Sequence, residues 1–255
     1  MANALIVGGS GQIGLDAAKR LAADGWDVTI ASRKQTEHTG PWSHVACDAK
    51  RPGGLQTVID RNYDLILSCI AFDATDAQEL INVQSYVGRI IVISSVSVCC
   101  DHNGRTLDEA REYGFPDFPN GFSEVCDTVP PGPETYSTRK VSMEQALRKN
   151  ATVPITILRP SAVHGPYSTH AREWWFVKRL LDGRKQIPLA FNGKSRMGTT
   201  SVNAISEAVI QANDGKLPTV VNVRDADSPS VYEIGSIIMS NMQREAELVC
   251  LPDDG

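Results

Sequence analysis

The sequence predicts an α/β protein with a doubly wound parallel sheet and a small C-terminal lobe. An apolar strand at the N-terminus runs into a glycine cluster, which opens into a segment with helical spacing. Further short apolar segments, several rich in β-branched residues, alternate with segments of helical spacing. Such alternation is typical of a parallel sheet covered by helices on both faces, with ligands at the carboxyl ends of the strands. With 255 residues, the chain is long enough for one large domain with a small lobe.

The glycine cluster is spaced for a dinucleotide. Gly8, Gly11 and Gly14 follow the strand that begins at Ala4, and a helix is expected over residues 15–23. The first glycine allows a tight turn, the second lets a pyrophosphate approach the backbone, and the third lets the helix lie close to the strand. Backbone N–H groups at a helix N-terminus lack partners, and the helix dipole favours an anion. This context predicts a Rossmann-type dinucleotide site.

The remaining elements are predicted from apolar runs and from helical spacing. Strands are expected over 27–31, 44–47, 64–70, 89–93, 154–158, 200–202, 220–223 and 247–251. Helices are expected over 55–59, 77–86, 134–149, 173–181, 204–212 and 232–242. The apolar face of the helix over 173–181 is interpreted as core: Trp174, Phe176, Val177, Leu180 and Leu181.

Residues 101–133 are predicted to form an insertion, because proline and glycine at this density are incompatible with a long helix or a central strand. A lid or substrate loop and a simple surface excursion both remain open. We expect a dinucleotide-binding domain over 1–160, with a catalytic helix at 134–149. Residues 161–255 are expected to be mostly a substrate-binding lobe, partly interleaved with the sheet.

Composition narrows the function classes. The net charge of −5, without a basic run, argues against nucleic acid as a partner. Without a leader or a long apolar span, we expect a cytoplasmic protein that does not enter a membrane. The six cysteines contain no C-x-x-C pair and are interpreted as reduced thiols. His164 and His170 are interpreted as loop residues, and no metal site is expected.

A tyrosine and a lysine on one face of a predicted helix indicate the chemistry of the site. Tyr136 and Lys140 are four residues apart, so both side chains point the same way. A free tyrosine has a pKa of about 10, and a nearby cation lowers that pKa. A tyrosine tuned in this way exchanges a proton with a carbonyl or hydroxyl oxygen while hydride is transferred. The strand over 89–93 leads into Ser94 and Ser95, whose hydroxyls stand where a substrate oxygen would bind.

With these motifs in this order, the chain resembles the extended short-chain dehydrogenases/reductases, in the NAD-dependent epimerase/dehydratase family. The matching segments are Gly8–Gly14, 92–98, Tyr136–Lys140 with Glu144, 158–166 and 196–202. The resemblance implies Tyr136 as general acid/base, Lys140 on the nicotinamide ribose, and Ser95 as the catalytic hydroxyl. We expect Ser97 and Arg196 to contact substrate. The expected cofactor-binding residues are Gly8, Gly11, Gln12, Ile13, Gly14, Ser32, Arg33, Asp48, Ile70, Ala71, Ser94, Tyr136, Lys140, Pro160, Ala162 and Val163.

The end of the second strand predicts the cofactor. An acidic residue at Ser32 would bind the ribose 2′-hydroxyl of NAD and repel a 2′-phosphate. The sequence has Ser32 followed by Arg33 and Lys34, and cations there can pair with a 2′-phosphate. We therefore predict NADP in preference to NAD; the alternative is that Arg33 only covers the adenine. Asp48 is expected near the adenine.

The function predicted is an NAD(P)-dependent oxidoreductase that transfers hydride at a carbonyl or secondary alcohol of a nucleotide sugar or small ketone, as an epimerase, dehydratase or reductase. The alternative is a non-catalytic NADP-binding or RNA-associated scaffold, because residues 174–179 are similar to a sub-branch with RNA-binding members. A third hypothesis is a redox-sensing regulator that uses Cys99 and Cys100. A homodimer is left open.

Overall fold

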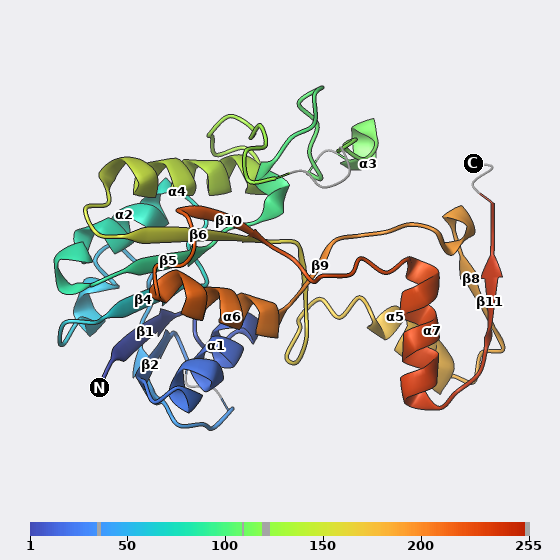
Figure 1. Cartoon of the computed structure of the whole chain (residues 1–255), viewed down its shortest axis with the longest axis horizontal. Helices are drawn as coiled ribbons and strands as arrows, with labels where there is room; N and C mark the ends of the chain where they lie inside the picture. Colours follow the sequence, from blue (N-terminus) through green and yellow to red (C-terminus); the bar gives the residue numbers. More distant parts are fainter. Residues whose placement is uncertain (35–36, 109, 119–122, 253–255) are drawn as a thin grey trace.

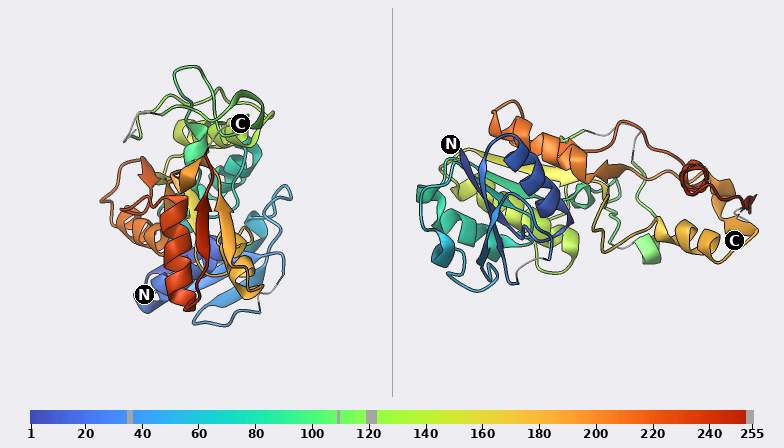
Figure 2. Two further views of the ribbon diagram at one scale, coloured as in Figure 1. Left: turned by 90° about the vertical axis from the view of Figure 1, so that its right-hand side faces the viewer. Right: turned by 90° about the horizontal axis from the view of Figure 1, so that it is seen from below.

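The computed structural model describes residues 1–34, 37–108, 110–118 and 123–252. Figure 1 shows a large α/β body with both faces of its sheet covered by helices, and a smaller lobe that extends to one side. The right-hand view of Figure 2, from below, shows the same separation of body and lobe. The glycine cluster and the predicted catalytic helix both belong to the large body.

The body is built on a seven-stranded sheet with the order β10-β6-β5-β4-β1-β2-β3. Its strands are β1 (Asn3–Val7), β2 (Asp27–Ser32), β3 (Ser43–Ala46), β4 (Leu65–Ser68), β5 (Ile90–Ile93), β6 (Ile155–Pro160) and β10 (Val220–Val223). Every pairing within the sheet is parallel. From β1 the sheet grows in one direction through β2 and β3, and then in the other direction from β4 onward. The strand order therefore reverses between β1 and β4, and such sheets bind ligands at the carboxyl ends of the strands that flank this reversal. The predicted doubly wound parallel sheet is confirmed.

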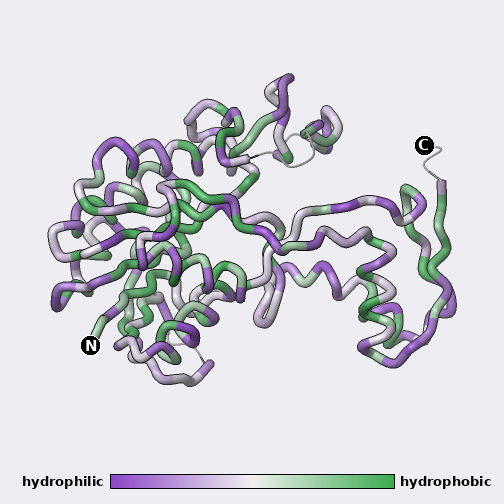
Figure 3. The backbone as a smooth tube through the Cα atoms, in the orientation of Figure 1, coloured by the Kyte–Doolittle hydropathy of each residue, from purple (hydrophilic) through white to green (hydrophobic). Residues whose placement is uncertain are grey.

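Two helix layers enclose the sheet. On one face, α1 (Gln12–Ala23) and α6 (Val202–Asn213) share an apolar core with β1 and β2, to which Leu21 and Ile205 contribute. On the other face, α2 (Ala74–Asn82) and α4 (Tyr136–Asn150) share a second core, to which Leu80 and Leu147 contribute. Each such fully buried side chain contributes about 1.5–3 kcal/mol to stability. In Figure 3, where the backbone is coloured by hydropathy, many residues of these strands and helices are green, which marks hydrophobic residues.

The lobe consists of α5 (Trp174–Leu181), β8 (Gln186–Leu189), α7 (Val231–Met242) and β11 (Glu247–Cys250). β8 and β11 pair in parallel as a two-stranded sheet. A small core holds the lobe together: Phe176, Leu180, Ile187 and Leu189. Between lobe and body, β7 (Ala162–His164) pairs with β9 (Thr199–Ser201). The last third of the chain therefore contributes both to the lobe and, through α6 and β10, to the body.

Several element predictions need correction. β7 and β8 were not predicted, because each is short and neither forms an uninterrupted apolar run. The helix expected over 55–59 is a 3₁₀ turn at Gln56–Val58. α2 begins earlier than expected because Asp73 caps it, accepting backbone N–H bonds from Thr75 and Asp76. A separate 3₁₀ turn, Gln84–Tyr86, follows α2.

The interpretation of the α5 aromatics is partly wrong. Phe176 and Leu180 are buried, but Trp174 is 52% exposed and Leu181 is 51% exposed. The neighbouring Trp175 stacks under the Arg179 guanidinium, 3.7 Å from its ring centroid. The lobe consists of only two helices and a two-stranded sheet, so the eight-residue helix α5 is covered on one side and its other side stays exposed.

The insertion contains a short helix, α3 (Ala110–Tyr113), and otherwise lacks regular structure where it is described. Residues 109 and 119–122, which include Pro119 and Gly121 of the predicted proline–glycine segment, lie outside the described residues. Within the described part of the chain, no helix combines the length and the apolar character needed to cross a membrane.

Candidate active site

The glycine turn at the end of β1 has the geometry of an anion cradle. Gly8 has φ +77°, and a Cβ there would lie 2.5 Å from Ile70 Cγ2. A Cβ at Gly14 would lie 2.5 Å from Gly9 Cα, so α1 approaches the turn as closely as glycine allows. The N-cap of α1 is Gly11, which makes no side-chain cap hydrogen bond. The first N–H groups of α1 are thus left to a ligand, and the turn fits a pyrophosphate.

Two serines follow β5 and face different partners. The Ser95 hydroxyl accepts a hydrogen bond from Ser97 N at 3.2 Å, which starts the 3₁₀ turn Val96–Val98. Ser95 also lies near the Tyr136 phenol, where it lowers the pKa of Tyr136 against the effect of burial. Ser94 is buried, and its hydroxyl donates to Glu144 Oε1 at 2.5 Å. Of the two serines, Ser95 is therefore the one beside the tyrosine, and its catalytic role stays a prediction.

The predicted catalytic helix, α4, begins at the predicted tyrosine. Thr135 is its N-cap and forms a reciprocal capping box with Thr138, which fixes Tyr136 as the first helical residue. Lys140, one turn later, is only 2% exposed. Its Nζ donates to Ala71 O at 2.7 Å and to Ile93 O at 2.8 Å. These two carbonyls hold the ammonium group between the ends of β4 and β5.

Burial changes the titration of Lys140. Loss of solvent is the largest cause, and the nearby Lys50 ammonium adds to it; together they lower the pKa of Lys140 to about 7. The opposite charges of Asp76 and Glu144 resist this shift. In the protein alone, Lys140 therefore exchanges its proton near neutral pH.

The expectation that a cation lowers the pKa of Tyr136 is wrong for this structure. Burial raises the pKa of Tyr136 above its ordinary value, the Ser95 hydrogen bond opposes the shift, and the Asp108 carboxylate adds to it. Lys140 Nζ lies 5.7 Å from the centroid of the Tyr136 ring and donates to carbonyls. Asp108, from the insertion, accepts a hydrogen bond from Ser137 N at 2.9 Å, which brings its charge to the start of α4.

Phe72 lies between two ammonium groups. Lys140 Nζ is 4.3 Å from the Phe72 ring centroid, and Lys50 Nζ is 4.6 Å from it. Lys50 also forms an ion pair with Asp76, and Asp76 Oδ2 accepts a hydrogen bond from Phe72 N at 2.6 Å. This aromatic and the Lys50 pair were not predicted. The one available signal was the position of Phe72, directly after Ala71 at the end of the fourth strand.

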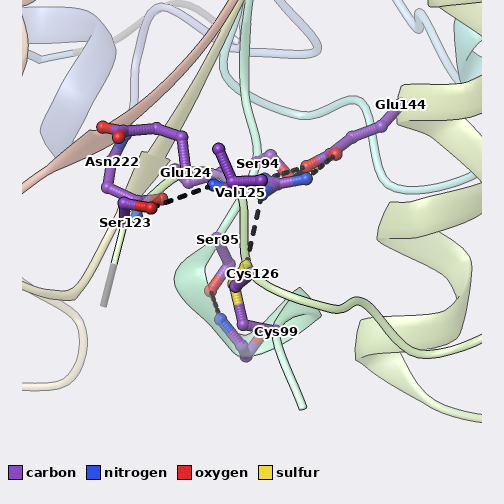
Figure 4. The surroundings of a disulfide bond; sticks show 11 residues. Ser94, Ser95, Cys99, Ser123, Glu124, Val125, Cys126, Glu144 and Asn222 are labelled. Atoms are coloured by element: carbon purple, nitrogen blue, oxygen red, sulfur yellow. Dashed lines mark hydrogen bonds and ion pairs between the residues drawn. A yellow bond between two sulfur atoms is a disulfide. The ribbon is translucent and has the colours of Figure 1, made fainter. Parts of the chain in front are cut away.

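Behind the serines lies a buried ion pair. Glu144 of α4 and Arg159 of β6 have side chains that are each 4% exposed, and Arg159 Nη2 lies 2.5 Å from Glu144 Oε2. Arg159 Nε donates to Glu144 Oε1 at 2.9 Å, so the pair is bidentate. With the bond from Ser94, this network connects α4, β5 and β6 (Figure 4).

A disulfide joins Cys99 to Cys126, so the prediction of reduced thiols is wrong for these two residues. They are 27 residues apart, a separation that matches no local cysteine pattern. Cys47, Cys69, Cys100 and Cys250 are free. The hypothesis that paired Cys99 with its neighbour Cys100 is also corrected, because the partner comes from the insertion. Figure 4 shows Cys126 next to Cys99, at the end of the segment that carries Glu124 and Val125.

The loop after β7 contacts the first residue of α1, next to the glycine turn. Gln12 Nε2 donates to Gly165 O at 3.2 Å, and the Tyr167 ring lies 4.0 Å from that of His38. His164 lies in β7 and is not a loop residue, and its Nε2 is 2.7 Å from Asp225 Oδ2. The pKa of Asp225 is lowered: burial alone would raise it, but hydrogen bonds from His164 and its neighbours outweigh burial.

The other expected residues lie at three places. Ile70, Ala71 and Ser94 follow β4 and β5. Ser32 ends β2, Arg33 follows it, and Asp48 follows β3. Pro160 ends β6, and Ala162 and Val163 belong to β7. The Ser97 hydroxyl is buried and has no hydrogen-bond partner among the described residues.

Arg196 donates to Ser228 O at 2.5 Å and pairs with Glu233 at the start of α7. It is thereby tied to residues at and just before the start of α7 in the lobe. Among the described residues, no three His, Cys, Asp or Glu side chains are grouped to hold a metal ion.

Comparison with known proteins identifies the family. The profile of the NAD dependent epimerase/dehydratase family matches residues 4–223. The chain belongs to this family. This confirms the resemblance stated above and the prediction of an enzyme. None of the curated proteins matches the sequence.

Solved structures share the fold of this family member. UDP-N-acetylglucosamine 4-epimerase from Methanobrevibacter ruminantium, solved with UDP-N-acetylmuramic acid, is 17% identical with a TM-score of 0.76; 99% of this chain covers 86% of that one. dTDP-glucose 4,6-dehydratase from Bacillus anthracis, solved with NAD, is 17% identical with a TM-score of 0.74; 100% of this chain covers 86% of that one. At this identity the likeness concerns the fold.

Proposed function

We propose that this protein interconverts a secondary alcohol and a carbonyl on a nucleotide sugar, as an epimerase or dehydratase, with NADP as hydride carrier. The observation that carries the proposal is the placement of Tyr136 at the start of α4, near the Ser95 hydroxyl and one helical turn from the buried Lys140, whose Nζ is held by the carbonyls of Ala71 and Ile93. When bound, the nicotinamide supplies hydride acceptance and donation. The expected cytoplasmic location and homodimer stay predictions.

Each residue of the set has one task. Tyr136 removes the proton of the substrate hydroxyl as hydride leaves the adjacent carbon, and returns it in the reverse direction. Ser95 donates a hydrogen bond to the same substrate oxygen. An ammonium has three donors, and Lys140 uses two on Ala71 and Ile93, so one remains for a ribose hydroxyl. The cationic oxidised nicotinamide favours the phenolate and so opposes the raised pKa of Tyr136.

Two observations support a nucleotide-sugar substrate. The buried Ser97 hydroxyl, two residues after Ser95, has no partner among the described residues, and a buried hydroxyl without a hydrogen bond is costly. A sugar hydroxyl provides that partner. In addition, the similar epimerase was solved with UDP-N-acetylmuramic acid. We assign the distal part of the substrate to the lobe, next to Arg196.

The end of β2 supports NADP. Ser32 presents a hydroxyl where a carboxylate would repel a 2′-phosphate, and it donates to Lys34 O at 2.8 Å while bonded to His44 Nε2 at 2.9 Å. The side chains of Arg33 and Lys34 are exposed beside it. A guanidinium and an ammonium group there can bind a phosphate.

The test combines a panel of UDP- and dTDP-linked sugars with either cofactor, and follows the sugar product by NMR and the nicotinamide by absorbance. We expect turnover of at least one nucleotide sugar, with NADP preferred.

Arg33→Ser should raise the KM for NADP about 10- to 100-fold, since a hydrogen bond to a charged group contributes about 1.5–3 kcal/mol. The KM for NAD should not change. Arg148→Ser, at the far end of α4, is the matched control. Reduction of simple ketones without turnover of any nucleotide sugar would contradict the proposal.

A further inference from the structure

The Cys99–Cys126 disulfide fastens the insertion to the wall of the proposed active site. Backbone bonds flank it on both sides: Cys100 N donates to Asp127 O at 2.9 Å, and Val129 N donates to Val98 O at 3.0 Å. Two residues before Cys126, Glu124 Oε1 accepts a hydrogen bond from Asn222 N at 3.0 Å (Figure 4). The covalent bond thus adds to the hydrogen bonds and apolar contacts that hold this end of the insertion.

One end of the disulfide leads to the catalytic serine. Cys99 directly follows the 3₁₀ turn Val96–Val98, and Ser95 is the N-cap of that turn. Cys99 is 1% exposed and shares a small apolar cluster with Val98, Val129 and Val141 of α4. Any movement of Cys99 is therefore transmitted through three residues to the Ser95 hydroxyl.

The other end leads to the catalytic helix. Arg159 Nη1 donates to Cys126 Sγ at 3.7 Å, and the same guanidinium forms the buried pair with Glu144. Glu144 lies one turn after Lys140 and also accepts the Ser94 bond. The Cys99 end thus adjoins the turn that Ser95 caps, and Cys126 Sγ contacts the guanidinium that pairs with Glu144 of α4.

The two sulfurs differ in access. Cys126 is partly exposed and lies in an exposed stretch, in which Val125 is 92% exposed. Cys99 is buried, so an incoming thiolate reaches Cys126 first. In the free neighbour Cys100, burial and the Asp127 charge raise the pKa of the thiol, which lowers its thiolate fraction and so its reactivity as a nucleophile. An external thiol is therefore the reactant that this bond can meet.

We propose that Cys99–Cys126 is a thiol-exchange site for a dithiol reductant, and that its reduction releases the insertion from the catalytic wall. A thiolate of the dithiol attacks Cys126 Sγ, the Cys99 sulfur leaves as a thiolate, and a mixed disulfide forms. The second thiol of the reductant then displaces Cys126. Two electrons pass from the dithiol to the protein, two protons end on Cys99 and Cys126, and the reductant becomes a disulfide.

Release of the insertion should lower turnover. It removes the covalent tie behind Ser95 and loosens the segment whose sulfur accepts a bond from Arg159. A displacement of about 1 Å in supporting groups can cost up to about 100-fold in rate, and we expect a fall in kcat of about tenfold. This second part rests on the proposed function, whereas the exchange itself does not.

The exchange site is tested without any assay of activity. Protein prepared without reductant should titrate four free thiols when denatured and six after dithiothreitol, and a peptide map should contain a Cys99–Cys126 cross-link. Trypsin should then cleave after Arg111, in the insertion, faster in the reduced protein. Cleavage after Arg184, in the lobe, is the internal control and should not change. Six thiols before reduction, or equal cleavage after Arg111 in both forms, would overturn the proposal.

The effect on the site is tested with the active protein. Oxidised wild type should lose about tenfold in kcat on treatment with dithiothreitol and recover it with a small-molecule disulfide. Cys126→Ser should show the low value in both conditions, and Cys100→Ser should respond as wild type does. Equal kcat before and after reduction of a proven disulfide would overturn the effect on turnover. Absence of any turnover, together with faster cleavage after Arg111, would remove the proposed function and leave the exchange site supported.

Discussion

Tyr136→Phe is expected to lower kcat by about 100- to 10,000-fold, the range for loss of a general acid/base. The substitution removes only the phenol oxygen, which lies near Ser95 and which we propose moves the substrate proton. The ring remains beside Phe72, 6.1 Å between centroids, and α4 keeps its Thr135 cap. Binding of NADPH, measured by nicotinamide fluorescence, should therefore not change.

The matched control for this variant is Tyr113→Phe. Tyr113 lies in α3 of the insertion and is 62% exposed. It loses the same oxygen without a role in the site, so kcat should equal that of wild type. Undiminished turnover in the Tyr136 variant would show that another group moves the proton.

Glu144→Gln is expected to destabilise the fold by about 3–5 kcal/mol, the usual result of removing one charge from a buried pair. The guanidinium of Arg159 would stay buried with a neutral amide as its partner, and its side chain is only 4% exposed. Urea denaturation of the protein without cofactor measures the change. The double variant Glu144→Leu with Arg159→Met should recover most of the loss, because it leaves no unpaired buried charge.

A surface pair provides the comparison. Arg20 and Glu207 link α1 to α6 at 3.2 Å, with side chains 34% and 49% exposed. Arg20→Met should cost about 1 kcal/mol or less, as exposed pairs do. If Glu144→Gln costs no more than Arg20→Met, the Glu144–Arg159 network does not hold α4 against β6 in the way described.

The sequence predicts the parts of this protein that depend on local patterns. The turn at Gly8 and Gly14 is visible because each residue meets a constraint that only glycine satisfies. The order of Ser95, Tyr136 and Lys140 is visible because each follows a recognisable strand or lies on a recognisable helix. For the same reason the doubly wound sheet is predicted, since alternating apolar strands and helices determine it.

What the sequence did not predict depends on contacts between distant segments. Cys99 and Cys126 meet only because the insertion folds back on the catalytic wall. Lys50 approaches Lys140 across Phe72, and this contact changes the expected electrostatics of the site. β8 pairs with β11 some 60 residues later, as Gln186 with Glu247, and neither strand alone carries a strong pattern. The exposure of Trp174 follows from the thinness of the lobe, which no local pattern reports.

The most direct test of the catalytic assignment is a crystal structure with NADP and a nucleotide sugar bound. We predict that the nicotinamide lies against the ends of β4 and β5, with Lys140 Nζ on a ribose hydroxyl and with Tyr136 Oη and Ser95 Oγ on one substrate oxygen. A cofactor whose nicotinamide lies away from these strand ends, with Lys140 still bonded only to the Ala71 and Ile93 carbonyls, would contradict it.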